Sequence, residues 1–178
     1  MMSDVQTKKF VHLFSVLDSD NSGTIEASDF ERLGNNLAAG RGWKKGEDNT
    51  KALVGRFLAQ WQMMMPFAQG GKISKDAFLQ MHEAMLDDRH LWEATIKALS
   101  DFVFFALDAD GDGKIGKAEH QAFFRAYDID EKESDELFPQ FDANHDGHLT
   151  QAEVYALVSQ YFFNDDPKTP GNYIFGKF

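Results

Sequence analysis

A twelve-residue segment, residues 108–119, places the strongest constraint on how this chain can fold. Carboxylates stand at its positions 1, 3 and 5, glycine at position 6, isoleucine at position 8 and glutamate at position 12. Ca²⁺ prefers six to eight oxygen ligands, and alternate carboxylates on a tightly turning backbone can converge on one ion. Gly113 permits the positive φ of the turn. The pattern predicts a calcium-binding loop between two helices, with ligands from Asp108, Asp110, Asp112, the Lys114 carbonyl and both oxygens of Glu119.

Residues 142–153, 34 residues further along the chain, have an oxygen-bearing side chain at each of positions 1, 3, 5 and 12, with asparagine at position 3 and leucine at position 8. Gly147 occupies the turn position, and the backbone carbonyl at position 7 and a hydroxyl at position 9 complete the expected set of ligands. The predicted ligands are Asp142, Asn144, Asp146, His148, Thr150 and Glu153. Together the two segments indicate paired helix-loop-helix units.

Residues 18–29, the first loop in chain order, follow the same pattern with a change at the last position. Its predicted ligands are Asp18, Asp20, Ser22, Thr24, Glu26 and Asp29. Asp29 is one methylene shorter than glutamate, so we expect it to offer the ion one oxygen. The first loop would then surround the ion with a tighter shell of six ligands, which accommodates Mg²⁺ better than the shells of the other two loops. The alternative is a loop that folds correctly and binds no ion in the cell.

Residues 66–77 keep the framework of such a loop but lack its ligands. When Ile73 is aligned with position 8, the four positions 1, 3, 5 and 12 carry no side-chain oxygen; they are Pro66, Ala68, Gly70 and Ala77. Gly71 remains at position 6. We therefore predict a silent loop whose role is structural, with Ile73 pairing across a short β-bridge with Ile25.

Apolar residues at helical spacing flank all four loops and predict an all-α fold. We expect four helix-loop-helix units in two pairs that form a compact globule, with short β-bridges between paired loops. The first pair is predicted at residues 1–88 and the second at residues 89–163. Residues 164–178 contain two prolines, so we expect a non-helical segment that folds back and buries four apolar side chains between the pairs; these are Tyr173, Ile174, Phe175 and Phe178.

The net charge of −11 argues against nucleic acid as a partner and favours cations. No stretch is long and apolar enough to predict a membrane span. The absence of cysteine and of a signal-peptide pattern at the N-terminus leads us to expect a cytoplasmic protein. No hydrolytic motif is present, so we do not expect an enzyme.

The three competent loops, the silent second loop and the Tyr-Ile-Phe-Gly segment at residues 173–176 resemble the invertebrate sarcoplasmic calcium-binding proteins, including their calexcitin-like members. The resemblance extends over essentially the whole chain. It implies an EF-hand buffer of Ca²⁺ and Mg²⁺ in the sarcoplasm of muscle. The loop residues themselves predict three Ca²⁺ ions, with Mg²⁺ most readily in the first loop. The resemblance also implies recognition by IgE, because shellfish members of the family are allergens.

Two other functions remain open at this point. A calexcitin-type sensor would expose a groove for a protein target when calcium binds, and five methionines could line it. These are Met63, Met64, Met65, Met81 and Met85. A photoprotein or luciferin-binding protein would enclose an aromatic molecule in a cavity lined by residues such as Trp61 and Trp92.

Overall fold

The computed structural model describes residues 2–87 and 89–178, with the side chains of residues 89–92 left out. Trp92 and Asp88, the last residue of the predicted first pair, therefore lie outside what is described. The described helices are α1 (Asp4–Leu17), α2 (Ala27–Gly40), α3 (Asp48–Met64), α4 (Lys75–Asp87), α5 (Arg89–Leu107), α6 (Lys117–Ala126), α7 (Lys132–Phe141) and α8 (Gln151–Phe163), with short 3₁₀ helices η1 (Met65–Phe67) and η2 (Pro170–Tyr173).

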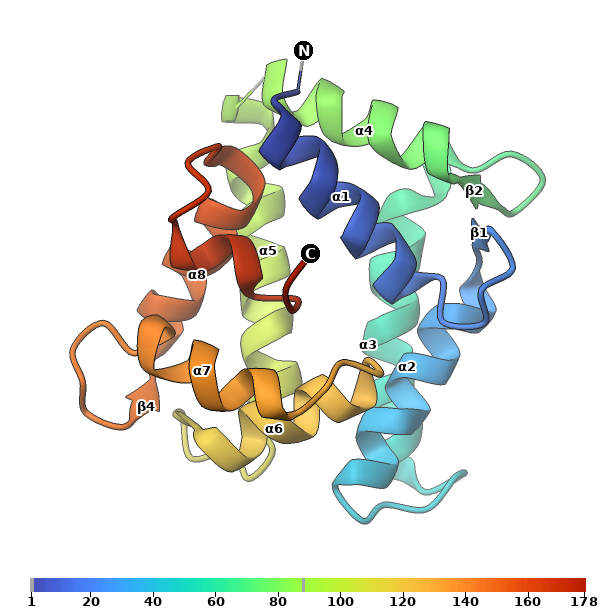
Figure 1. The fold of residues 1–178 in the computed structure, drawn as a ribbon. Coiled ribbons are helices and arrows are strands. Elements are labelled where there is room, and N and C mark those ends of the chain that lie inside the picture. The colour runs from blue at the N-terminus through green and yellow to red at the C-terminus, as the bar shows by residue number, and fades with distance from the viewer. Residues whose placement is uncertain (1, 88) are drawn as a thin grey trace.

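Four two-residue strands join the loops in pairs. Strand β1 (Thr24–Ile25) pairs antiparallel with β2 (Ile73–Ser74), and β3 (Ile115–Gly116) pairs with β4 (His148–Leu149). The β1–β2 ladder and the β4 loop lie on opposite sides of the molecule (Figure 1). The all-α EF-hand fold and the pairing of Ile25 with Ile73 are thus confirmed.

Local sequence explains where the first helix begins and which face it buries. Ser3 caps α1, since its hydroxyl accepts from the Gln6 N–H at 3.2 Å while the Gln6 side chain accepts from the Ser3 N–H at 2.9 Å. This reciprocal capping box satisfies two N–H groups that have no partner within the helix. The apolar stripe that includes Phe10 and Phe14 is buried.

One hydrophobic cluster runs through both halves of the chain. Phe57 of α3 meets Phe102 of α5 edge to face, with ring centroids 4.9 Å apart. Phe10 of α1 meets Phe162 of α8 at 5.9 Å. Aromatic pairs of this kind add about 0.5–1.5 kcal/mol beyond the area that they bury. The first and second pairs of hands therefore share a core.

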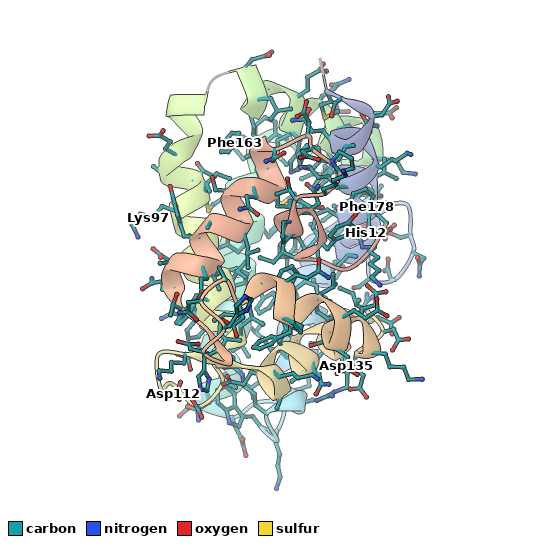
Figure 2. The ribbon with its side chains drawn as sticks, turned by 60° about the vertical axis from the view of Figure 1, so that its left-hand side comes forward. His12, Lys97, Asp112, Asp135, Phe163 and Phe178 are labelled. Atoms are coloured by element: carbon teal, nitrogen blue, oxygen red, sulfur yellow. The ribbon has the colours of Figure 1, made fainter. Side chains whose placement is uncertain are left out.

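The segment after α8 folds back onto the molecule, although less completely than its apolar residues predict. Ile174 and Phe175 are buried, and the Phe175 carbonyl lies 2.9 Å from the ring nitrogen Nε2 of His12 in α1. Phe178, in contrast, is 41% exposed, so its predicted burial is wrong. It stacks on the half-buried Tyr173 at 5.6 Å and lies beside His12 at the surface (Figure 2). A ring at this position gains only a partial contact, because no element covers its outer face.

In the part of the chain that the structure describes, no helix has both the length and the apolarity needed to cross a bilayer.

Candidate metal centres

Three loops begin with an aspartate that organises the turn behind it. Asp18, Asp108 and Asp142 immediately follow the helices α1, α5 and α7, and the carboxylate of each accepts from the N–H of the glycine at position 6. The three distances are 2.9, 3.2 and 2.8 Å. A second oxygen of each carboxylate accepts from another N–H of the same loop. The first ligand position is therefore fixed by the backbone before any ion is considered.

The backbone of these three loops turns in the same way. Position 4 has a positive φ in each loop, between 56° and 76°, and position 6 has a φ between 82° and 86°. The residues at position 4 are Asn21, Gly111 and His145, and those at position 6 are Gly23, Gly113 and Gly147. Position 6 is glycine in all three loops, because a residue with a Cβ atom would be strained at that φ. Three segments far apart in the sequence thus share one ligand-presenting conformation.

Carboxylate oxygens converge in two of the loops. Asp108, Asp110 and Asp112 each offer an oxygen, and these atoms all lie within 4.8 Å of one another. The same holds for Asp18, Asp20 and Asp29. Negative charges this close repel one another unless a cation lies between them. Figure 2 shows Asp112 at the outer edge of the molecule, in a loop open to ions from solution.

The fourth loop uses an amide in place of one carboxylate. The Asn144 side-chain oxygen accepts from the Asp146 N–H at 2.9 Å, and its Nδ2 donates to the Asp146 carboxylate at 3.2 Å. The Asp146 carboxylate also accepts from the His148 N–H at 3.0 Å. This loop therefore presents the same series of oxygens with one negative charge fewer.

The residue at position 12 divides the loops into two kinds. One oxygen of Glu119 accepts from the Ala109 N–H at 2.8 Å and the other from the Gly116 N–H at 2.8 Å, so its carboxylate spans the loop. Glu153 does the same, accepting from the Ala143 N–H at 3.0 Å and the Thr150 N–H at 2.8 Å. These two glutamates lie where a bidentate ligand is required.

Asp29 makes only one of the two backbone contacts that the glutamates make. Its carboxylate accepts from the Glu26 N–H at 2.8 Å, which corresponds to the second contact of the glutamates, but across the loop it meets the Ser19 hydroxyl at 3.3 Å. Burial raises the pKa of Asp29, and the Glu26 N–H opposes the rise. The shorter side chain thus caps α2 while leaving the first loop less tightly closed.

The remaining predicted ligands lie at the bases of the loops. Thr24 and His148 open β1 and β4, and Lys114 immediately precedes β3. Glu26, at position 9, precedes α2, and Thr150, at the same position, donates from its hydroxyl to Glu153 at 2.8 Å. The Ser22 hydroxyl donates to the Thr24 carbonyl at 3.0 Å. All of the predicted ligands therefore belong to loops of one architecture.

The second loop closes on itself where an ion would otherwise lie. Gln69 and Lys72 form an isolated β-bridge, with N–H to carbonyl distances of 2.8 and 3.1 Å. Gly70 and Gly71 between them both have positive φ, at 60° and 80°, as a two-residue hairpin turn requires. Positive φ therefore falls at positions 5 and 6 in this loop, instead of positions 4 and 6.

Two cationic side chains contact the first loop. The sequence analysis did not connect either of them with an ion site. The Lys72 ammonium lies 2.6 Å from the Glu26 carboxylate, and the Arg32 guanidinium lies 3.3 Å from Asp20 and 3.9 Å from Asp29. The hydrogen bond from Lys72 lowers the pKa of Glu26. The register of Ile25 with Ile73 was the signal that could have indicated Lys72, because it places residue 72 opposite residue 26.

A largely apolar cavity of about 270 Å³ lies between α1, α3, α4 and α5, and Phe67 of the second loop also borders it. His82 lies in its wall, and burial lowers the pKa of its ring to about 4, so the ring is neutral at pH 7. Four of the five methionines predicted to line a groove border this cavity; they are Met63, Met64, Met81 and Met85. Met65 is 41% exposed and does not border it, and Trp61 is buried against Phe30.

Comparison with known proteins agrees with this geometry. A family model described as an EF-hand domain pair matches residues 98–159, and one described as EF hand matches residues 10–33. The chain is 26% identical to the sarcoplasmic calcium-binding protein alpha chain of Penaeus vannamei, over 89% of this chain and 88% of that protein. It is 24% identical to calerythrin of Saccharopolyspora erythraea, over 92% and 95%. The coelenterazine-binding protein of Renilla muelleri, in its calcium-loaded apo form, has the same fold, with a TM-score of 0.82 at 19% identity over 99% of this chain and 100% of that one.

Proposed function

We propose that the chain is a non-enzymatic EF-hand calcium-binding protein of the sarcoplasmic calcium-binding protein type, and that it acts as a Ca²⁺/Mg²⁺ buffer with three ion sites. The sites are loops 18–29, 108–119 and 142–153, with the seventeen ligands predicted above. Loop 66–77 holds no ion and serves as the structural partner of the first. Three ions would offset six of the eleven net negative charges.

The shared conformation of the three loops is the observation that supports three ion sites. Each has positive φ at positions 4 and 6, and each directs its first carboxylate onto the position-6 N–H. The second loop differs in both respects. Because the position-12 ligand of the first loop is an aspartate, we propose that Mg²⁺ competes with Ca²⁺ most effectively at this site.

The segment after α8 supports a buffer over a sensor. A sensor uses calcium to open an apolar groove for its target. Here Phe175 borders the apolar cavity and is 5% exposed, and the segment is tied to α1 through His12 and Lys9. An intramolecular segment thus occupies surface that a target would need. We place the protein in the cytoplasm, where Ca²⁺ and Mg²⁺ buffering is required.

Calorimetric titration of the metal-free protein with Ca²⁺, with and without millimolar Mg²⁺, tests the proposal. We expect three Ca²⁺ ions per chain, with Mg²⁺ weakening the apparent affinity of one site more than the other two. Binding of a fourth ion, or of fewer than three, would contradict it. A fluorescent dye for apolar surfaces should respond little to Ca²⁺, whereas a marked rise would favour the sensor.

The cavity favours one second candidate, a carrier of an uncharged apolar molecule. Its volume of about 270 Å³ approaches the lower end of small-molecule pockets, about 300 Å³, and is too small for a target helix. A neutral His82 and apolar walls give no countercharge for an acid. Equilibrium binding of coelenterazine to the apo and calcium-loaded protein tests this candidate. Absence of binding in both states removes it.

A further inference from the structure

The ammonium group of Lys72 belongs to the silent second loop but contacts the first loop. Its Nζ lies 2.6 Å from a carboxylate oxygen of Glu26, which also accepts from the Thr24 hydroxyl at 3.2 Å. We propose that Lys72 is a built-in competitor cation, which holds Glu26 and lowers the affinity of loop 18–29 for divalent ions. This inference rests on the proposed function of that loop as an ion site.

The backbone holds Lys72 in this place independently of its charge. Thr24 pairs with Ser74 and Ile25 with Ile73, so the next pair of the antiparallel ladder sets residue 26 opposite residue 72. Ile25 and Ile73 are both fully buried, which fixes this register. The Gln69–Lys72 hairpin closes from the other side. The backbone therefore brings the two side chains within reach of each other, whatever their charge.

A second cation contacts the same loop from α2. Arg32 donates to the Ser19 hydroxyl at 2.9 Å and to the Asp20 carboxylate at 3.3 Å. Asp20 and Glu26 are both predicted ligands of the ion, so each cation contacts a group that the ion would also use. Two positive charges thus face the four acidic side chains of this loop.

The C-terminal pair has the same ladder without this arrangement. Its position-9 residues are Gly116 and Thr150, which carry no charge, and they stand opposite His148 and Lys114 in the register. Within residues 2–87 and 89–178, no lysine or arginine forms an ion pair with a carboxylate of loops 108–119 or 142–153. Arg41 of α2 interacts electrostatically with Asp108 and Glu119, but its guanidinium donates to the Phe105 and Ala106 carbonyls and not to a ligand. Among the described residues, direct contact between a cation and a predicted ligand side chain is therefore found in the pair that contains the silent loop.

The expected size of the effect follows from the exposure of the pair. The side chains of Lys72 and Glu26 are 56% and 30% exposed, so solvent screens the interaction. Removing one positive charge several ångströms from a divalent ion should raise its affinity about three- to tenfold at low ionic strength. Added salt should reduce that factor, since exposed charges are screened within about 10 Å at 0.1 M.

The amide protons of Gly23, Gly113 and Gly147 allow each site to be followed separately by NMR, because each donates to the first carboxylate of its own loop. In a Ca²⁺ titration of the full chain, Lys72→Gln should lower the midpoint of Gly23 about three- to tenfold and leave those of the other two unchanged. Lys72→Arg, which keeps the charge, should restore the original midpoint.

Two further variants separate a specific contact from a change in net charge. Lys51→Gln removes the same charge from an exposed lysine of the same half that pairs with Asp48, and it should not move the Gly23 midpoint. In a Glu26→Gln background, Lys72→Gln should have a smaller effect than it has alone. An unchanged Gly23 midpoint in Lys72→Gln, or an equal shift in Lys51→Gln, would overturn the inference. A Gly23 signal that ignores Ca²⁺ in the original protein would instead refute the first ion site itself, and the inference with it.

Discussion

The two pairs of loops have the same skeleton and different chemistry. In each, a two-residue antiparallel ladder joins the loops, and its central apolar residues are almost completely buried. The C-terminal pair carries predicted ligands in both loops, whereas one loop of the N-terminal pair has a Gly-Gly hairpin and a lysine where such ligands would stand. A loop without ligand side chains can thus keep its place in the fold, because the ladder and the helices around it form without them.

The largest expected effect comes from removing a glutamate at position 12 of the C-terminal pair. Glu119→Gln or Glu153→Gln should each eliminate one site, because breaking one partner of a charge pair costs about 3–5 kcal/mol, or at least about 100-fold in affinity. Calorimetry should count two ions in place of three. The matched variant in the silent loop, Ala77→Glu, should add none, since its positions 1, 3 and 5 still lack oxygen side chains. Three ions in either glutamine variant would contradict the assignment.

The ladder itself should matter equally in both pairs when metal is absent. Ile73→Ala and Leu149→Ala each remove a fully buried side chain, which should lower the free energy of unfolding by about 2–4 kcal/mol. Urea unfolding in the presence of a chelator measures this loss. In saturating Ca²⁺ we expect the C-terminal variant to recover more stability, since two ions bind across its ladder and one across the other. Equal recovery of stability in the two variants would contradict the difference in ion number between the two pairs.

Acid should weaken both halves through buried neutral histidines. Burial lowers the pKa of His82 to about 4 and that of His120 to about 3, against an ordinary value of 6.5. The unfolded chain therefore binds more protons, so stability is full above pH 6.5 and is lost as the pH falls toward 4. For His82 the loss should reach about 3 kcal/mol.

Denaturant unfolding of the metal-free protein between pH 7 and pH 4 measures this dependence. His82→Phe should flatten the curve by the contribution of His82, and His120→Phe by that of His120. The Nδ1 atom of His82 donates to the Phe78 carbonyl at 2.8 Å, whereas the Nδ1 atom of His120 lies 2.7 Å from the Ser134 hydroxyl. An unaltered slope in both variants would show that other groups cause the acid sensitivity.

The smallest expected effect would make the first loop more like the third. Asp29→Glu should let the carboxylate reach the N–H groups of positions 2 and 3, as Glu119 does at 2.8 and 3.4 Å. We expect about tenfold tighter Ca²⁺ binding at this site, equivalent to about 1.4 kcal/mol, and weaker competition by Mg²⁺. Competitive titration measures both. An unchanged Ca²⁺ to Mg²⁺ preference would show that chain length at position 12 does not set it.

Sequence sufficed for features that are encoded locally or by register. The turn glycines, the position-8 residues and the helix stripes fixed four loops and their partners, because each requirement falls on one residue at a set spacing. It failed for Phe178, whose burial depends on what covers it, and for Met65, which lies in a 3₁₀ helix that has no buried residue. The Lys72 contact needed two loops to be read against each other.

The buried Lys9 has a consequence for how the protein is made. Its ammonium is fully buried and donates to the Asn164 carbonyl at 2.5 Å and to the Asn172 side chain at 3.1 Å, while burial lowers its pKa to about 8. These acceptors are translated more than 150 residues after the lysine. In a nascent chain the first helix therefore cannot reach its final packing, and the Lys9 amine stays in water, until residues 164–172 have also been synthesised.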